Sequence, residues 1–248
     1  NFNQLVKICR KHDIGTIKME VFRNIPPKNN FLHKVRKLAD KNNIVLIFDE
    51  CTSGFRETFG GLHKKYKIIP DICILGKALG NGYPITAILG KKDIMNNAKN
   101  SFISSTFWTD RVGFVAALET LNLMEKQKSW KQISKTGNNI KKKWSTIGSK
   151  NKLNLKISGL SSCPSFQILS KNWIKYKTLI TQYMLENNFL ASNTIYVSTE
   201  HNNPKIFQKY FKLLDFIFKE IKLCELGIKD INKLLKTEVC QTGFKRLN

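Results

Sequence analysis

The sequence predicts an α/β protein in which a mostly parallel sheet is followed by a smaller α+β part. In the first half, short apolar runs of strand length alternate with segments of helical periodicity, and several runs end in polar residues or glycines. The chain has 248 residues, of which 42% are hydrophobic and 10% aromatic, so it can bury a sizeable core. We therefore expect a globular fold.

The first half contains four predicted strands, with a helix between the first two. The strands are expected at residues 15–21 (GTIKMEV), 44–48 (IVLIF), 71–75 (DICIL) and 85–89 (ITAIL). In the helix, apolar residues recur on one face, at Phe31, Leu32, Val35, Leu38 and Ala39. The uninterrupted run IVLIF is typical of a parallel sheet that is covered on both faces. In such a sheet, functional groups collect at the carboxyl ends of the strands.

From about Thr109 onward, helical patterns predominate. A long helix is expected first, with apolar residues at three- and four-residue steps from Phe114 to Met124. A lysine-rich helix, two strands and two further helices follow, near residues 127–148, 153–157, 165–169, 176–187 and 207–221. We accordingly divide the chain into a sheet domain, a connecting loop with a helix, and a small α+β domain, at residues 1–98, 99–126 and 127–248.

The formal net charge of +24 leaves two interpretations open. Clustered lysines and arginines bind phosphate backbones, so the chain could be a basic nucleic-acid-binding module whose affinity falls steeply with salt. The lysines are instead spread among helical polar positions, and no recognition fold or aromatic stacking motif accompanies them. We therefore favour a biased composition, with nucleic acid as a minority hypothesis. No apolar run is long enough to cross a bilayer, so we expect no membrane partner.

The cysteines, the histidines and the first residues bear on metal binding, on the cellular compartment and on the start of the chain. The six cysteines form no CxxC pair, and neither they nor the four histidines show the spacing of a metal site or of a catalytic triad. This cysteine usage fits a reducing cytoplasm, and the opening NFNQLVKICRKHD lacks the layout of a signal peptide. Because the first methionine is Met19, we expect a fragment whose true start is missing.

The segment GKALGNGYP, residues 76–84, directly follows the apolar strand DICIL and carries Lys77. A lysine at a buried strand end can have a lowered pKa, because burial disfavours the ammonium form, and can then attack carbonyl carbons. The neighbouring glycines allow a tight turn and close approach to a ligand. A Walker phosphate loop is excluded, because Asp71 and Ala78 stand where that motif needs a glycine and a Ser or Thr.

The segment FDECTSGFR, residues 48–56, places Asp49 at the end of another buried strand. Asp49 and Lys77 can therefore project from neighbouring strand ends into one crevice. A carboxylate there can keep the nitrogen of a pyridine ring protonated, which makes the ring an electron sink. Taken alone, Asp49 is more simply interpreted as a helix cap or as half of an ion pair, for example with Arg56.

Four motifs share their order and spacing with one family. MExxRN (19–24), FDECTSGFR, PDICILGKALGNGYP (70–84) and SSTFWTDR (104–111) resemble the class III aminotransferases that depend on pyridoxal 5'-phosphate (PLP), and most closely the glutamate-1-semialdehyde 2,1-aminomutase-like branch. The ending CQTGFKRLN resembles that branch too, so the likeness extends through essentially the whole chain. It implies the PLP-dependent transferase fold type I, with residues 1–98 as the carboxyl-terminal part of the large cofactor-binding domain.

The resemblance also implies a role for five residues. Lys77 would form the Schiff base with PLP and later move a proton between the substrate carbon and the cofactor. Asp49 would pair with the pyridine nitrogen, and Cys51 would pack beneath the ring, where a small and fairly apolar side chain fits. Thr106 would contact the cofactor phosphate of the partner subunit, which implies a homodimer with shared active sites. Asn24 would lie close to the ring.

Some neighbouring residues keep alternative roles. Glu20 falls where the family has a glutamate near the site. Ser104 and Ser105 either assist the phosphate contact or belong to a solvated loop. Arg56 either binds a substrate carboxylate or braces Glu50, and we favour bracing.

The favoured hypothesis is an enzyme that transfers an amino group between a small-molecule amine and a carbonyl compound, or shifts it within one molecule, with PLP on Lys77. The family's earlier region, which holds a phosphate-binding loop and a ring-stacking aromatic residue, is not recognisable in this sequence. We therefore expect the chain alone to bind PLP weakly. The alternative is a catalytically incomplete fragment or a non-catalytic partner subunit that retains the fold. The nucleic-acid hypothesis predicts instead that loss of Lys77 leaves binding unchanged.

Overall fold

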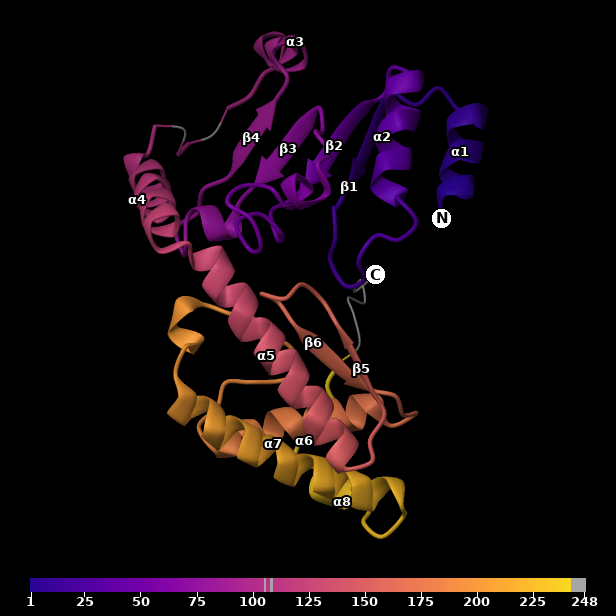
Figure 1. Ribbon diagram of the computed structural model, residues 1–248, viewed down its shortest axis with the longest axis vertical. Coiled ribbons are helices and arrows are strands. Elements are labelled where there is room, and N and C mark those ends of the chain that lie inside the picture. The colour runs from indigo at the N-terminus through magenta and orange to yellow at the C-terminus, as the bar shows by residue number, and fades with distance from the viewer. Residues whose placement is uncertain (105, 108, 242–248) are drawn as a thin grey trace. The chain divides into compact units, whose positions relative to one another are not determined.

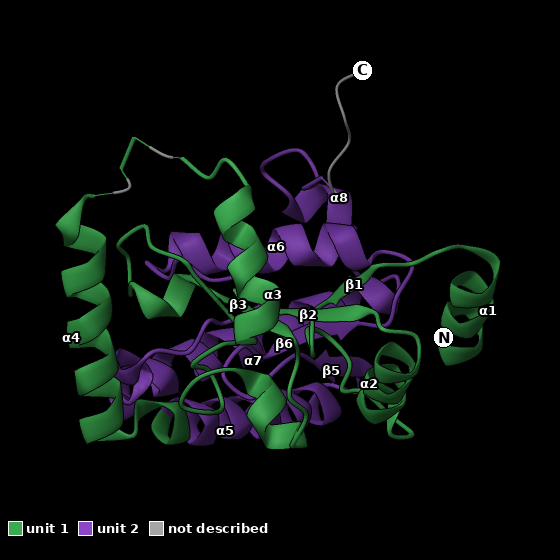
Figure 2. Ribbon diagram, turned by 90° about the horizontal axis from the view of Figure 1, so that it is seen from above, with its two compact units in different colours: residues 1–132 green, residues 133–248 purple. Residues whose placement is uncertain are grey.

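The chain forms two compact units, Asn1–Gln132 and Ile133–Asn248 (Figure 2). The structure is a computed structural model that describes residues 1–104, 106–107 and 109–241. The first unit is an open sheet with helices, and the second combines helices with a small sheet (Figure 1). The predicted α/β fold is confirmed.

The sheet of the first unit has four strands in the order β1-β2-β3-β4 (Figure 1). These strands span Thr16–Met19, Val45–Asp49, Ile72–Leu75 and Ala87–Gly90. The first three run parallel, and β4 pairs antiparallel with β3. Because β2 and β3 are parallel neighbours, their carboxyl ends lie at the same edge of the sheet.

The connection from β1 to β2 contains α2, Phe31–Lys41. Its periodic apolar positions bury one face of the helix, at Leu32, Val35 and Ala39. On β2, the alternate residues Leu46 and Phe48 are fully buried, whereas Val45 and Ile47 are half-buried. Among the described residues, one face of β2 is therefore covered more completely than the other, which differs from the equal cover that the apolar run predicted.

A buried carboxylate joins several elements of the first unit. Asp71 lies directly before β3 and accepts hydrogen bonds from Arg36 Nη1 (2.8 Å) and from the Leu46 backbone N–H (2.7 Å). Lys91 Nζ lies 2.6 Å from its other oxygen. Burial alone would raise the pKa of Asp71, but the backbone N–H and the two cations outweigh it and hold that pKa below its usual value. Asp71 thus ties α2, β2 and the end of β4 together as an ionised group.

Six further helical elements lie in the described part of the first unit, and of these only the long helix α4 was predicted. Apart from α2, the first unit contains α1 (Phe2–Lys11), η1 (Leu62–Tyr66), η2 (Lys77–Leu79), α3 (Lys92–Met95), η3 (Asn96–Asn100) and α4 (Arg111–Gln127). The side chain of Asn1 caps α1 by accepting a hydrogen bond from the Asn3 backbone N–H (3.1 Å). The ring of Phe2 meets that of Phe31 edge to face, so α1 is joined to α2 by an aromatic contact.

The helix α4 begins at a capped terminus and leaves apolar side chains exposed. Asp110 is its N-cap and accepts a hydrogen bond from the Val112 backbone N–H (3.0 Å). Ala117 is buried, but more than half of the surface of four larger side chains is exposed. These four residues, which we call the apolar face of α4, are Val112, Phe114, Val115 and Leu118. Exposed apolar residues that gather on one element indicate contact with another molecule or chain segment.

The second unit packs helices with a two-stranded antiparallel sheet. Its elements are β5 (Leu155–Ser158), β6 (Ser165–Ile168), α6 (Trp173–Glu186), η4 (Thr199–His201), α7 (Pro204–Glu225) and α8 (Ile231–Leu234), and α5 (Ser129–Lys150) leads into it. The predicted strands and helices of this half are all present. The small α+β part of the fold is therefore confirmed.

Large aromatic side chains form the centre of the second unit. The rings of Trp144 and Phe166 lie 4.8 Å apart between centroids, and Phe218 lies 5.7 Å from Phe166. Trp144 Nε1 donates a hydrogen bond to Tyr210 Oη (3.1 Å), so two buried polar atoms satisfy each other. Side chains of α5, β6 and α7 thus meet at the centre of this core, to which α6 and α8 also contribute buried side chains.

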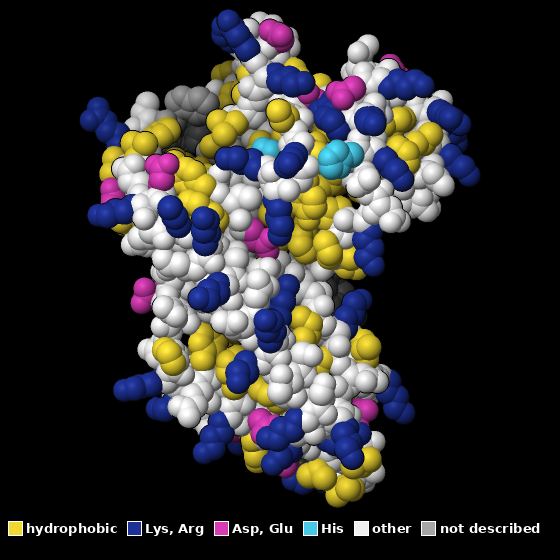
Figure 3. Space-filling model, in the orientation of Figure 1, with side chains coloured by type: hydrophobic (Ala, Val, Ile, Leu, Met, Phe, Trp, Pro, Cys, Tyr) yellow, Lys and Arg dark blue, Asp and Glu magenta, His cyan; other side chains and the backbone are white. Residues whose placement is uncertain are grey.

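The surface of the described residues bears on two of the predictions about partners. No helix in this part of the chain combines the length and the apolar character needed to cross a membrane. On the face that Figure 3 shows, lysine and arginine side chains are scattered over both units and do not gather in one patch. The face in this view therefore carries no concentrated basic patch, and the nucleic-acid hypothesis stays a prediction.

Candidate functional site

Asp49 and Lys77 lie at the same edge of the sheet in the first unit. Asp49 is the last residue of β2, and Lys77 follows the end of β3 and begins η2. Asp49 is in register with Ile74 of the neighbouring parallel strand. The two residues therefore leave the sheet from adjacent strand ends, where ligands of open α/β sheets bind.

Lys77 is held in an unusual backbone conformation by the turn that follows β3. Its φ angle of 47° lies in the left-handed region, which residues other than glycine adopt rarely. Such conformations cost on the order of 1–3 kcal/mol and concentrate at functional sites. The Lys77 ammonium donates a hydrogen bond to Thr52 Oγ1 (2.7 Å). The backbone and this single contact together fix the direction of the side chain.

The Lys77 side chain is exposed in the described structure. The strand end that precedes it is buried, as predicted, since Leu75 is 5% exposed, but the Lys77 side chain itself is not buried by the described residues. The apolar strand β3 ends before Lys77, and the turn carries the side chain out of the core. Desolvation of the amine therefore has to come from a bound ligand or from a further chain segment.

Two glycines allow the loop after Lys77 to fold back on itself. A Cβ at Gly80 would lie only 2.2 Å from the Tyr83 carbonyl oxygen, and Gly82 has a φ of 112°. Beside this loop is an open cavity of about 450 Å³, lined by Arg56, Lys77, Ala78, Asn81, Gly82, Tyr83 and Pro84. The glycines thus shape a hollow into which a ligand can approach the lysine.

Asp49 is a partly exposed carboxylate with two partners. Its Oδ2 lies 3.2 Å from Lys18 Nζ, and its Oδ1 accepts a hydrogen bond from the Cys51 backbone N–H (3.3 Å). Burial alone would raise the pKa of Asp49, but the Cys51 N–H and the Lys18 ammonium outweigh it, so that pKa lies below its usual value. Asp49 thus forms an ion pair with Lys18. Asp49 is therefore ionised at neutral pH.

Cys51 and Thr52 complete the cluster between the two strand ends. Cys51 is half-buried, and its Sγ lies 3.4 Å from the place where a Cβ of Gly76 would stand. Burial raises the pKa of the Cys51 thiol, and the nearby Asp49 carboxylate raises it further, so the sulfur is a neutral packing group. Thr52 was not among the predicted site residues. The only signal for it was a hydroxyl residue in the turn after Asp49.

The described structure does not bring the other predicted residues into this cluster through any contact. Asn24 and Thr106 are exposed, and Ser104 is exposed as well. Glu20 forms an ion pair with Arg23 (3.2 Å). It stays a prediction that Asn24 lies close to the cofactor ring and that Thr106 contacts a cofactor phosphate. Ser105, like Trp108 in the same motif, lies outside the described residues.

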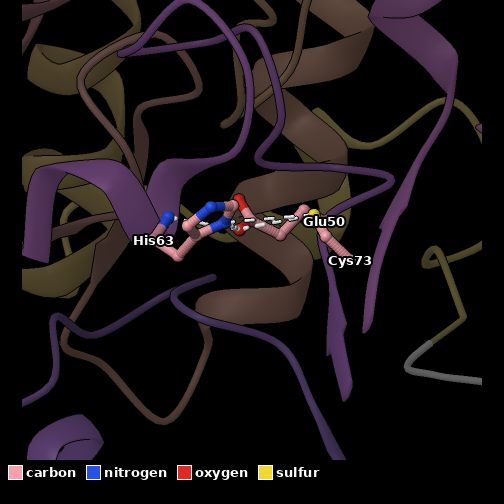
Figure 4. A group of neighbouring side chains, drawn as sticks. All are labelled: Glu50, His63 and Cys73. Carbon is pink, nitrogen blue, oxygen red and sulfur yellow. Dashed lines mark hydrogen bonds and ion pairs between the residues drawn. The ribbon is translucent and has the colours of Figure 1, made fainter. Parts of the chain in front are cut away.

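Glu50, next to Asp49, belongs to a different set of contacts. It is fully buried and accepts hydrogen bonds from Ser53 Oγ (3.2 Å) and from the backbone N–H groups of Leu62 and His63. The His63 ring nitrogen Nδ1 lies 2.5 Å from Glu50 Oε1 (Figure 4). These contacts hold Glu50. Arg56 lines the cavity beside Lys77, and its bracing of Glu50 stays a prediction.

Comparisons with known proteins agree on one family. The sequence profile described as Aminotransferase class-III matches residues 24–182. The 3-aminobutyryl-CoA aminotransferase of Cloacimonas acidaminovorans is 30% identical over 177 residues, which cover 71% of this chain and 42% of that protein. The glutamate-1-semialdehyde 2,1-aminomutase of Wigglesworthia glossinidia brevipalpis is 29% identical over 216 residues, which cover 86% of this chain and 50% of that protein.

A solved structure shares the fold. The FumI protein of Sphingopyxis sp. MTA144, solved in a form that carries PLP, matches with a TM-score of 0.83 at 20% identity, over 95% of this chain and 59% of that one. The PLP-dependent transferase fold type I is therefore confirmed. The chain spans about half the length of the curated relatives that it matches.

Proposed function

The chain belongs to the class III aminotransferase family, and on that basis we propose that it acts in PLP-dependent transfer of an amino group between a small-molecule amine and a carbonyl compound, or in its shift within one molecule. The two relatives differ in this respect, since one is named an aminotransferase and the other an aminomutase. The observation that carries the proposal is the placement of Lys77 and an ionised Asp49 at adjacent strand ends.

The residues at this edge of the sheet fit PLP. When bound, the cofactor supplies a carbonyl carbon for a lysine amine and a pyridinium ring that withdraws electrons. Asp49 would hold the ring nitrogen protonated, which requires a carboxylate that stays ionised at neutral pH. Cys51 offers a small, neutral surface for the ring face. The cavity beside Lys77, of about 450 Å³, has the size of small-ligand sites.

Lys77 would hold the cofactor through its amine and would later carry a proton on Nζ from one substrate position to another. The hydrogen bond from Nζ to Thr52 Oγ1 (2.7 Å) occupies one side of that nitrogen. The rest of the nitrogen is then free to face the cavity. Thr52 is thus a positioning residue, since it directs the amine rather than reacting itself.

We also propose a homodimer in which each copy contributes to the other's site. The apolar face of α4 leaves apolar side chains in water, which association with a second copy would remove. Thr106 precedes this helix by a few residues and is exposed. A second copy that covers α4 would therefore also meet the segment that contains the Thr106 hydroxyl.

A cytoplasmic location is the remaining part of this proposal. The described structure joins none of the six cysteines in a disulfide. Free thiols persist in reducing compartments and tend to be oxidised outside them. Fractionation of cells that produce the natural protein tests this assignment, and recovery with secreted proteins would contradict it.

The catalytic proposal is tested by an amino-transfer assay with PLP. We would compare the longest natural protein that contains this sequence with residues 1–248 alone, using an amine donor and a carbonyl acceptor, and a single amino aldehyde for the aminomutase reaction. We expect amino transfer or shift by the natural protein and its loss in the Lys77→Ala variant. Equal activity of wild type and Lys77→Ala would contradict the assignment.

A second candidate is a catalytically incomplete fragment or a non-catalytic partner subunit. Two observations favour it. The Lys77 side chain is exposed, and the chain spans about half the length of the relatives that it matches. It predicts that residues 1–248 bind PLP weakly and turn over slowly. Turnover by residues 1–248 at the rate of the natural protein would exclude it.

A further inference from the structure

Three side chains that can bind metals converge in the first unit. They are Glu50, directly after β2, Cys73 in β3 and His63 in η1 (Figure 4). His63 Nδ1 lies 2.5 Å from Glu50 Oε1, and Cys73 Sγ lies 4.0 Å from Glu50 Oε1 and 3.9 Å from His63 Nδ1. One carboxylate oxygen, one imidazole nitrogen and one thiol sulfur therefore surround a common point.

Backbone geometry holds these atoms in place before any ligand binds. The N–H groups of Leu62 and His63 fix the Glu50 carboxylate from the start of η1, and Ser53 Oγ fixes it from the preceding turn. A Cβ at Gly61 would lie 2.3 Å from His63 Nδ1 and 2.8 Å from Glu50 Oε1. Only glycine at this position lets the imidazole and the carboxylate meet. The convergence is thus built into the loop between β2 and η1.

The group is buried but can be reached. Glu50 is 0% exposed and Cys73 6%, whereas the His63 side chain is 17% exposed. His63 and Cys73 both line a cavity of about 430 Å³, together with Gly60, Gly61, Lys64 and Lys91. This cavity offers a path of entry and leaves room for a water molecule as a further ligand.

The ligand types and spacing suit a divalent transition metal such as Zn²⁺. Zn²⁺ takes sulfur, nitrogen and oxygen ligands at about 2.0–2.3 Å in a tetrahedron, which places the ligand atoms about 3.3–3.7 Å apart. The two distances to sulfur exceed this by a few tenths of an ångström, and the nitrogen–oxygen distance has to open by less than 1 Å.

Charge balance favours the same kind of ion. A dication with the Glu50 carboxylate and the Cys73 thiolate has no net charge, which matters because an unbalanced charge is costly in a buried site. Binding replaces the proton on Cys73 Sγ with the metal, and that proton passes to solvent. His63 binds as the neutral imidazole.

We propose that Glu50, His63 and Cys73 form a binding site for a divalent transition-metal cation, with a fourth position open to the adjacent cavity. The site does not depend on the amino-transfer function, because none of its three ligands contacts Lys77 or Asp49 through a described hydrogen bond or ion pair. Sequence spacing did not predict it, since the ligands come from three separate elements.

Cobalt titration of the metal-free protein tests the site, because Co²⁺ bound to a thiolate absorbs in the near ultraviolet. We expect one Co²⁺ per chain with this absorption, displacement of Co²⁺ by Zn²⁺, and a rise in melting temperature with either ion. The Cys73→Ser variant should lose the absorption. The His63→Ala variant should bind Co²⁺ at least about tenfold more weakly.

Matched controls separate this site from other thiols and imidazoles. The Cys9→Ser and His33→Ala variants, which change residues of α1 and α2, should bind Co²⁺ like the wild type, and so should Lys77→Ala even if amino transfer is lost. If Cys73→Ser fails to fold, the near-ultraviolet absorption of the wild type with Co²⁺ tests whether a thiolate binds the ion. Absence of the thiolate absorption in the folded wild type, or its persistence in Cys73→Ser, would overturn the proposal.

Discussion

The two units of this protein differ in what they bury. The second unit closes an aromatic core from its own elements, in which even Trp144 Nε1 and Tyr210 Oη are partners. The first unit buries the carboxylates Glu50 and Asp71, places Asp49 at a strand end, and leaves the apolar face of α4 exposed. Buried charges and exposed apolar surface both cost stability unless they have partners. The first unit thus gathers buried carboxylates and the candidate site at its sheet, whereas the second is centred on aromatic packing.

The largest expected effect falls on chemistry in the first unit. Lys77→Ala should lower amino transfer by at least about 10²–10⁴-fold, because the proton carrier and the cofactor link are lost together. The free energy of unfolding should hardly change, since the side chain is exposed and makes one described hydrogen bond. Steady-state kinetics and denaturant unfolding measure the two quantities. The matched control is Lys92→Ala in α3, which should leave the rate of amino transfer and the free energy of unfolding unchanged. A large loss of stability in Lys77→Ala would contradict the contrast between the two units.

The reverse pattern is expected in the second unit. Trp144→Ala should lower the free energy of unfolding by about 3–5 kcal/mol, because it leaves a cavity beside Phe166 and removes the partner of Tyr210 Oη. Thermal or denaturant unfolding monitored by circular dichroism measures this. Leu226→Ala, at a residue that is 59% exposed, should cost less than about 0.5 kcal/mol. Similar losses for the two variants would contradict a core formed around Trp144.

Removal of a buried charge from the first unit should lower the free energy of unfolding almost as much as Trp144→Ala does in the second. Asp71→Asn removes the ionised partner of Arg36 and Lys91 and should cost about 2–3 kcal/mol at pH 7. The pKa of Asp71 lies below its usual value in the folded state, so its stabilisation is present above the unfolded-state pKa. It is lost as the pH falls through the folded-state pKa.

The difference in stability between wild type and Asp71→Asn should therefore shrink toward zero in acid. Melting temperatures of both proteins from pH 7 down to pH 2 measure this. The control Asp93→Asn, at an acid in the first turn of α3, should track the wild type. A difference that stays constant over this range would show that the charge of Asp71 does not contribute.

The apolar face of α4 should affect association rather than folding. Leu118→Glu places a charge in this face, so it should weaken self-association at least about tenfold while leaving the melting temperature of the dissociated chain within experimental error. Sedimentation velocity over a range of concentrations measures this. The control is Leu190→Glu, at a residue of the second unit that is 97% exposed. Unchanged association of Leu118→Glu would remove α4 from the proposed interface.

The smallest effect is expected at Thr52. Thr52→Val keeps the shape of the side chain and removes the acceptor for Lys77 Nζ, so amino transfer should fall by roughly threefold to tenfold, equivalent to about 1 kcal/mol. The loss should fall on kcat rather than on KM, because Thr52 directs the reacting amine, and Thr52→Ser should restore kcat. An unchanged kcat in Thr52→Val would leave Thr52 with a packing role only.

Much of the first unit could be predicted from the sequence, because local patterns determine it. Apolar runs of strand length gave β2 and β3, and the glycines and the polar residue after each run placed Asp49 and Lys77 at the strand ends. The helix α1 also had a local pattern, because Phe2, Leu5, Val6 and Cys9 recur at helical spacing after the N-cap Asn1, and this pattern was overlooked.

The contacts that sequence reasoning missed depend on side-chain direction across separate elements. Lys77 meets Thr52 over 25 positions, and His63 meets Glu50 over 13 and Cys73 over 10. Rules for metal ligands use short spacings within one element, and these ligands share none. The exposure of Lys77 was missed for a related reason, since an apolar strand says nothing about what covers the residue after its end.

The central claim is that the first unit presents Lys77 to PLP, and borohydride reduction tests it most directly. The natural protein and residues 1–248 would each be mixed with stoichiometric PLP, reduced, digested and mapped by mass spectrometry. We predict a single phosphopyridoxyl group on Lys77, absent from Lys77→Ala and unaffected by Lys92→Ala. Labelling of another lysine in its place, or no labelling of the natural protein, would contradict the account.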